Sequence, residues 1–258
     1  MRFGWCGSEE TIPIVKAAGY DYVELPLAAT LRPEDPARAD LGALRSALEG
    51  LGPTAFNVFL PGDLKVTGPA VDAARQERYL QAAFARAAAI GGTVAVFGSA
   101  GARNYPEGFS KETALGQIVQ FLKLAGPIAA QYGVTVAIEP LNTGESNIVN
   151  SVAEGVAVAR EVGHPSIQVL SDLYHVDREG QPYSETAAAG SRLRHVHVAG
   201  KEGRRAPILD DIDYIAGFFR VLKETGYTGA VSVEGNAPDP AVQAPESLEV
   251  LRAAWEKA

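Results

Sequence analysis

The chain has 258 residues, of which 47% are hydrophobic and 21% are charged, as is typical of a globular protein with a large core. The net charge of −8 and the absence of a long basic cluster argue against a nucleic-acid partner and against binding to a membrane surface. A single cysteine, Cys6, excludes an intrachain disulfide, and no apolar stretch is long enough to span a bilayer. With no signal-like segment at the N-terminus, these features favour a cytoplasmic location.

Short apolar runs rich in β-branched residues alternate with Ala- and Leu-rich stretches of helical periodicity along the whole chain. In chain order, the expected elements are strand Arg2–Cys6, helix Ile12–Ala18, strand Tyr22–Leu27, helix Leu41–Leu51, strand Thr54–Leu60, helix Val71–Ile90, strand Thr93–Gly98, helix Lys111–Tyr132, strand Thr135–Leu141, helix Val152–Val162, strand Ile167–Asp172, a short helix Tyr183–Ala189, strand Leu193–Ala199, helix Ile212–Thr225, strand Ala230–Glu234 and helix Pro245–Lys257. Glycines after the helices are typical of helix C-termini, and they are Gly19, Gly52, Gly91, Gly133, Gly163 and Gly226.

Eight strand-then-helix units predict an α/β fold with a parallel sheet and right-handed crossovers. Closing the eight strands gives a single (β/α)8 TIM barrel, which we expect to form one domain over residues 1–258. An open doubly wound sheet is the alternative. It is disfavoured because the first strand is followed by Gly4-Trp-Cys-Gly-Ser, which lacks the glycine spacing of a dinucleotide site.

Four late strands each end in a residue that can bind a metal ion. Glu139, Asp172, His197 and Glu234 each follow an apolar run directly. Because active sites of barrels lie at the C-terminal ends of the strands, we expect these side chains to meet at one mouth. Three converging carboxylates repel one another, and a divalent cation resolves that repulsion. The mixed oxygen and nitrogen set suits Mn²⁺, Mg²⁺, Co²⁺ or Zn²⁺.

Other polar residues of the strands have weaker signals. Any one strand-end glutamate is, taken alone, more often a surface or capping residue. Glu24 ends the second strand, where it either lines the mouth or packs and caps. His195 has the same parity as His197 but lies deeper in the strand, so we expect a hydrogen bond behind the site. His164 lies in a helix-to-strand loop at the opposite end of the barrel, where a structural role is expected.

Several segments together resemble the xylose isomerase-like barrel superfamily, and within it the branch of D-tagatose 3-epimerase-like and hydroxypyruvate isomerase-like sugar enzymes. The resemblance covers nearly the whole chain. The segments that carry it are Glu139-Pro-Leu-Asn-Thr-Gly-Glu145-Ser-Asn147, Asp172-Leu-Tyr-His175, His195-Val-His197-Val and Val231-Ser-Val-Glu234, with Asn57-Val-Phe-Leu-Pro-Gly62 and Phe97-Gly-Ser99 in support.

The resemblance implies roles for individual residues. Glu139, Asp172, His197 and Glu234 would bind one divalent metal ion, and Glu139 and Glu234 would also be the acid/base pair. The candidates for contact with a sugar substrate are His175, Glu145, Glu24, Asn57 and one of the two arginines after His197, Arg204 or Arg205. Arg205 is favoured because Ala206-Pro207 follows it. The turn that usually comes next in the family is replaced by Pro207-Ile-Leu-Asp-Asp-Ile212, so substrate choice does not carry over.

The function expected from this set is a divalent-metal-dependent sugar isomerase or epimerase, which removes a proton next to a carbonyl through a metal-stabilised enediolate. One alternative is a metal-dependent dehydratase or lyase of a cyclic polyol or related acid. A metal-dependent endonuclease is disfavoured by the acidic charge and by only four histidines. A non-catalytic sugar-binding barrel would not need the whole set. The resemblance also implies that a homo-oligomer can form.

Two segments on the same side of the expected barrel are long for connections between a strand and a helix. They are Pro61–Pro69, which contains Lys65, and Ala100–Ser110, which contains Arg103. They are candidates for a lid or a wall of the substrate pocket, and ordinary exposed loops are the alternative.

Overall fold

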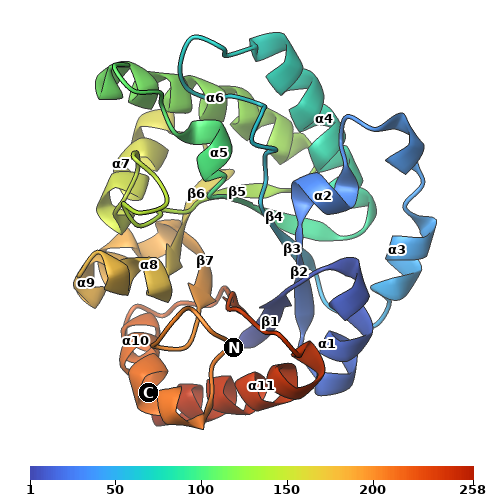
Figure 1. Ribbon diagram of the computed structural model, residues 1–258, viewed down its shortest axis with the longest axis vertical. Helices are drawn as coiled ribbons and strands as arrows, with labels where there is room; N and C mark the ends of the chain where they lie inside the picture. Colours follow the sequence, from blue (N-terminus) through green and yellow to red (C-terminus); the bar gives the residue numbers. More distant parts are fainter.

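The computed structural model describes residues 1–258, and its eight strands close into a parallel barrel in chain order (Figure 1). The last strand pairs with the first, which leaves no free sheet edge. The strands are β1 (Arg2–Cys6), β2 (Tyr22–Pro26), β3 (Thr54–Asn57), β4 (Gly92–Phe97), β5 (Thr135–Ile138), β6 (Ile167–Asp172), β7 (Leu193–Val198) and β8 (Ala230–Val233). The predicted (β/α)8 barrel is therefore confirmed.

Helices surround the barrel as an outer ring (Figure 1). They are α1 (Ile12–Ala18), α2 (Leu27–Leu31), α3 (Gly42–Ala47), α4 (Ala73–Ala89), α5 (Ala100–Arg103), α6 (Lys111–Gln131), α7 (Val152–Val162), α8 (Leu173–Arg178), α9 (Tyr183–Ala189), α10 (Ile212–Glu224) and α11 (Pro240–Lys257), with four 3-10 turns at Glu9–Thr11, Pro36–Ala39, Gly190–Arg192 and Leu209–Asp211. None of the helices combines the length and the apolarity that crossing a membrane requires.

The largest errors of the sequence prediction lie at the ends of elements. Helix α11 begins at Pro240 and not at Pro245, because Asp239 caps it by accepting a hydrogen bond from the Ala241 amide at 3.2 Å. Strand β3 ends early because Val58 turns the chain at a positive φ of 43°. The short helices α2, α5 and α8 were not predicted, since four to six residues are too few to show helical periodicity.

The glycine prediction holds at five of its six positions. Gly19, Gly91, Gly133, Gly163 and Gly226 all have positive φ. Gly52 does not. Helix α3 ends at Ala47, so the left-handed residue is Gly50, with a φ of 85°.

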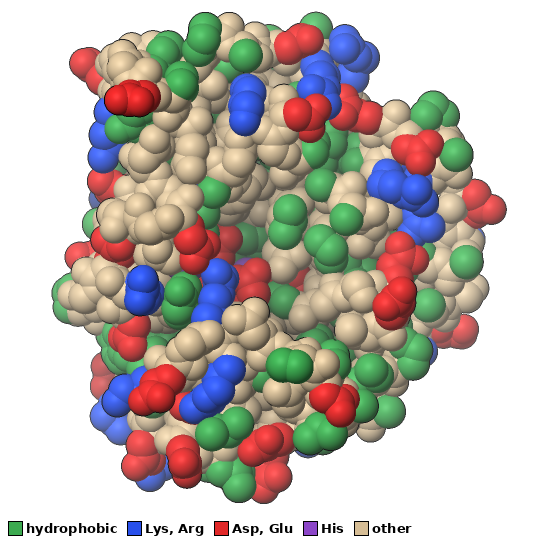
Figure 2. Space-filling view, viewed as in Figure 1, with side chains coloured by type: hydrophobic (Ala, Val, Ile, Leu, Met, Phe, Trp, Pro, Cys, Tyr) green, Lys and Arg blue, Asp and Glu red, His purple; other side chains and the backbone are tan.

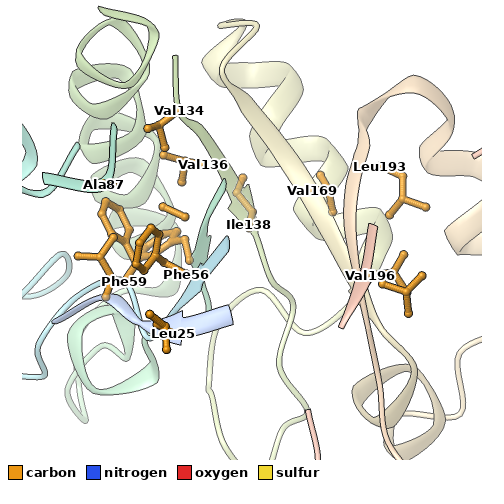
Figure 3. Close-up of a cluster of buried hydrophobic side chains, with 14 of the residues drawn as sticks. Leu25, Phe56, Phe59, Ala87, Val134, Val136, Ile138, Val169, Leu193 and Val196 are labelled. Atoms are coloured by element: carbon orange, nitrogen blue, oxygen red, sulfur yellow. The ribbon is translucent and has the colours of Figure 1, made fainter. Parts of the chain in front are cut away.

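Strand side chains alternate between two buried layers, and this alternation positions the site. Outward-facing residues such as Leu25, Phe56, Val136 and Val169 pack against the helices in the main core (Figure 3). Inward-facing residues fill the barrel itself, and they are Tyr22, Ala55, Val94, Val96, Ala137, Leu170 and Ala230. A polar residue two positions after one of these faces the barrel axis at the next layer towards the C-terminal mouth.

Candidate active site

Four consecutive strands bring three carboxylates and one imidazole together at the mouth of the barrel. Glu139 follows β5, Asp172 ends β6, His197 lies near the end of β7 and Glu234 follows β8. One ligand atom from each side chain lies within 4.8 Å of the others. Figure 2 shows a hollow near the middle of this face, with acidic and basic side chains together at its edge. The structure thus brings together all four predicted ligands.

His197 is the centre of this cluster and is completely buried. Its Nδ1 lies 3.2 Å from an oxygen of Glu139 and 3.2 Å from an oxygen of Glu234, and its Nε2 lies 3.0 Å from Glu24 Oε1. Burial lowers the pKa of His197, but the carboxylates of Glu24 and Glu234 outweigh it and raise that pKa well above its usual value. The surrounding carboxylates thus favour the protonated form of this imidazole.

The carboxylates of the cluster do not ionise alike. Burial and the negative charge of Glu234 raise the pKa of Glu139. Burial also raises the pKa of Asp172 to about 6, although the Arg204 guanidinium opposes that shift. Burial acts on Glu234 in the same sense, but His197 and Arg204 outweigh it and lower its pKa to about 2. The pocket thus resists three negative charges, which a divalent cation would compensate.

A second group of potential ligands shares His197 with the first. Atoms of Cys6, Glu24 and His197 also lie within 4.8 Å of one another. Glu24 is a poor ligand there, because its two oxygens already accept hydrogen bonds from His197, His195 and Ser232. The donor set at the mouth, with oxygens that face one another and an open cavity beside them, fits a divalent ion better.

Arg204 reaches into the cluster from the loop after β7. Its Nη2 donates to Glu234 at 2.6 Å and lies 3.4 Å from Asp172. Its Nη1 approaches Glu145 at 3.4 Å, and its guanidinium lies 4.7 Å from the centre of the Tyr174 ring. These contacts place a fixed positive charge at the edge of the site.

The sequence favoured Arg205 over Arg204 as the arginine at the site, but in the structure Arg204 lies at the site and Arg205 does not. The Arg205 guanidinium pairs with the buried carboxylate of Asp211, which also accepts hydrogen bonds from the amides of Lys201 and Ile208. Arg205 therefore braces its own loop. Arg204 has a positive φ of 49°, which turns it away from its neighbour and towards the mouth.

His175 is held with one ring nitrogen pointing to the site. The amide of Asn142 donates to His175 Nδ1 at 3.2 Å, so the proton of a neutral ring lies on Nε2. That Nε2 is buried, has no hydrogen-bond partner and lies 3.7 Å from Asp172. The Asn142 side chain also donates to Glu145 at 2.9 Å, which fixes Glu145 beside the cluster. His175 Nε2 is therefore a hydrogen-bond donor that is free to bind a substrate oxygen.

A cavity of about 350 Å³ opens beside the cluster. Its lining includes Cys6, Asn57, Val58, Arg204 and Glu234. The Asn57 side-chain amide donates to Glu234 at 3.0 Å, and its carbonyl oxygen is buried without a partner. Asn57, a candidate for contact with substrate, therefore lies against both the cavity and a predicted ligand.

The expectation that Glu24 contacts substrate is wrong. Its side chain is 0% exposed and lies beneath His197, away from the cavity lining. His197 and His195 hold its carboxylate ionised, because together they outweigh the effect of burial and lower its pKa well below its usual value. His195, which donates from Nε2 to Glu24 at 2.8 Å, lies behind the site as expected.

Arg103 was considered for a pocket wall, but it is completely buried. Its Nη1 donates to the carbonyl oxygens of Phe97 and Glu139, both at 2.8 Å, and its Nη2 lies 3.4 Å from that of Val149. This arginine therefore joins the C-terminal ends of β4 and β5 through the backbone carbonyls of Phe97 and Glu139. Its sequence context gave no sign of this, since an arginine in a loop is usually exposed.

Comparison with known proteins gives the family of this chain. Residues 12–254 match the family model described as "Xylose isomerase-like TIM barrel". The chain belongs to this family. It is 29% identical over 235 residues to an L-ribulose 3-epimerase of Methylomonas sp. (strain DH-1), covering 88% of this chain and 78% of the relative. It is 32% identical over 135 residues to a 3-dehydro-D-guloside 4-epimerase of Escherichia coli (strain K12), covering 51% and 50% of the two chains.

The fold is also shared with solved structures. A D-allulose 3-epimerase from Methylomonas sp. in complex with D-allulose superposes with a TM-score of 0.84, at 24% identity, over 98% of this chain and 96% of that one. The predicted superfamily is confirmed, and the epimerases among the relatives agree with the prediction that this chain is an enzyme of the isomerase class.

Proposed function

We propose that the chain is a divalent-metal-dependent sugar epimerase or isomerase, which moves a proton at a carbon next to a carbonyl. The observation that carries this proposal is the meeting of three carboxylates and one imidazole at the C-terminal mouth of the barrel, where all but the half-buried Glu234 are buried. The family relatives support it, since they include enzymes named for 3-epimerisation and 4-epimerisation of sugars.

Glu139, Asp172, His197 and Glu234 would hold the metal ion. Hard oxygen donors with one imidazole suit Mn²⁺, Mg²⁺, Co²⁺ or Zn²⁺, and the adjoining cavity leaves room for substrate oxygens. Such an ion supplies Lewis acidity to the substrate carbonyl, which makes the neighbouring C–H group more acidic. Proton transfer and substrate binding fall to the side chains of the protein.

Proton transfer is assigned to Glu139 and Glu234. One carboxylate takes the proton from carbon, and the other, which carries a proton of its own, delivers that proton to the opposite face or to the adjacent carbon. Return to the opposite face gives epimerisation, and return to the adjacent carbon gives isomerisation. Glu234 is oriented by Asn57 and Arg204, which hold its two oxygens separately. The backbone carbonyl of Glu139 is fixed by Arg103. Each such acid/base group contributes about 10²–10⁴-fold in rate.

Substrate oxygens are bound by residues around this pair. His175 offers an unpartnered Nε2 donor, and Arg204 offers guanidinium donors at the edge of the cavity. Glu145, held by Asn142, accepts a hydrogen bond from a substrate hydroxyl. A pocket lined by so many donors and acceptors suits a small polyhydroxylated substrate, and a ketose or a keto derivative of a sugar also supplies the required carbonyl.

The test is a metal-dependent exchange assay. Protein stripped with a chelator is incubated in D₂O with L-ribulose, D-allulose or hydroxypyruvate, with and without Mn²⁺. We expect sugar interconversion, with deuterium incorporated next to the carbonyl, only when the metal is present. Glu139→Gln and Glu234→Gln should each lose at least about 100-fold in rate while they remain folded. Glu112→Gln, an exposed carboxylate in α6, is the matched control and should keep the full rate.

Near-normal rates in either active-site variant would end the acid/base assignment. A product that lacks one water molecule relative to the substrate would point instead to the dehydratase or lyase alternative. The choice of metal, the cytoplasmic location and the formation of a homo-oligomer stay predictions.

A further inference from the structure

The Glu24 carboxylate lies inside the barrel, one layer beneath the mouth. It is 0% exposed, and three groups donate hydrogen bonds to it. Oε1 faces His197 Nε2 at 3.0 Å. Oε2 faces His195 Nε2 at 2.8 Å and accepts from the Ser232 hydroxyl at 2.5 Å. A buried carboxylate with both oxygens satisfied is stable in this position and has no free oxygen for a ligand.

The directions of these hydrogen bonds follow from the chemistry of the groups. An ionised carboxylate only accepts, so both imidazole Nε2 atoms that face Glu24 must carry a proton. Ser232 gives its single proton to Glu24, and therefore the Tyr22 hydroxyl, 2.8 Å away, donates to Ser232. The network has one consistent arrangement of protons, and it ends at His197.

The proton on His197 Nε2 decides what the other ring nitrogen does. Nδ1 lies 3.2 Å from an oxygen of Glu139 and 3.2 Å from an oxygen of Glu234, on the side of the ring that faces the predicted ligands. A neutral imidazole with its proton on Nε2 has its lone pair on Nδ1. That lone pair points to the place where a cation would be held.

We propose that Glu24 is a positioning residue that keeps the proton of His197 on Nε2 and thereby makes Nδ1 the metal-binding atom. The proposal rests on the proposed function, because it concerns the same ion. Carboxylates behind a metal-bound histidine are known to fix its tautomer and ring orientation, and their loss weakens metal binding by about 10- to 100-fold. The Glu24 carboxylate is hydrogen-bonded to His195 and Ser232, and Tyr22 holds Ser232 in turn, so the carboxylate is kept from turning.

The first test replaces Glu24 by its amide. In Glu24→Gln, one oxygen becomes an NH₂ group, so at least one donor of the network faces another donor. If the NH₂ group faces His197, the ring must turn or move its proton to Nδ1; if the oxygen faces His197, the Nε2 proton loses its charged acceptor and is held less firmly. We expect the dissociation constant for Mn²⁺, measured by calorimetry on the chelator-stripped protein, to rise by about 10- to 100-fold.

The control is Ser171→Ala on β6, directly before the predicted ligand Asp172. It removes a buried hydrogen bond of 2.7 Å to Thr186, on the outward face of the strand. It should change the Mn²⁺ dissociation constant by less than about twofold. Equal affinity in Glu24→Gln and wild type overturns the proposal, and so does an equal loss in both variants. A wild-type protein that binds no divalent ion overturns the proposed function as well.

A second measurement needs no variant and separates tautomer control from the mere loss of a charge. With only four histidines, ¹⁵N-histidine-labelled protein loaded with Zn²⁺ gives a readable spectrum. We expect the His197 Nε2 proton to be shifted downfield and protected from exchange, as in a hydrogen bond to a carboxylate. A Zn²⁺-loaded protein with the His197 proton on Nδ1 overturns the proposal, even if Glu24→Gln does not fold.

Discussion

Gly98 lets the Glu139 carboxylate lie against the end of β4, and a single methyl group there tests how closely the site is set. Gly98 directly follows β4, and its φ lies outside the left-handed region, so alanine fits the backbone. A Cβ at this position would lie 2.2 Å from Glu139 Oε2 and 3.3 Å from the carboxyl carbon. Since real Cβ contacts at under 3.0 Å essentially do not occur, the carboxylate must move.

The size of the effect follows from that distance. Restoring an ordinary contact requires the carboxylate to shift by about 1 Å, and a misplacement of that size costs about 100-fold in rate, or about 2.7 kcal/mol of transition-state free energy. We therefore expect Gly98→Ala to lower kcat/KM by about 100-fold. Because Glu139 is also a predicted metal ligand, Mn²⁺ affinity should fall in the same variant.

The assay compares Gly98→Ala with Gly116→Ala, an exposed helical position in α6 where an added Cβ meets no atom within 4 Å. Gly116→Ala should keep full activity and gain about 0.5–1 kcal/mol in unfolding free energy. Both variants are followed by sugar turnover, Mn²⁺ calorimetry and urea unfolding. If Gly98→Ala has wild-type turnover and wild-type metal affinity, the assignment of Glu139 to the site is refuted.

Three further changes test other parts of the site. Mn²⁺ affinity should fall below about pH 6, with a slope that approaches about tenfold per pH unit, because burial raises the pKa of Asp172 to about 6 and a proton then competes with the cation; calorimetry between pH 5 and pH 7 that shows no such fall contradicts this. Arg204→Ala should lower kcat/KM by at least about tenfold, whereas Arg205→Ala should mainly lower the melting temperature, and steady-state kinetics with thermal unfolding separate them. Arg103→Met should cost about 3 kcal/mol in urea unfolding and also reduce turnover, whereas Arg86→Met, which removes a similar set of bonds to carbonyl oxygens outside the site, should reduce stability alone.

The sequence alone determined the barrel and which four side chains meet at its mouth, because both depend on local patterns. Apolar runs followed by helical stretches repeat eight times, and that repetition is enough to predict the closed parallel sheet. Strand parity then places Glu139, Asp172, His197 and Glu234 on the inner face at the same end. Neither step needs knowledge of any contact between distant residues.

Only the tertiary structure decided the roles of residues whose surroundings come from elsewhere in the chain. Arg204 and Arg205 are adjacent in an irregular loop without periodicity, and contacts with Glu234 and Asp211 determine which of them enters the site. Glu24 shows the same limit: the sequence placed it at the end of the second strand and left its role open, because its depth beneath His197 follows from the relative register of β2, β7 and β8. Direction is set by the local backbone, whereas depth and partners are set by how the closed barrel packs.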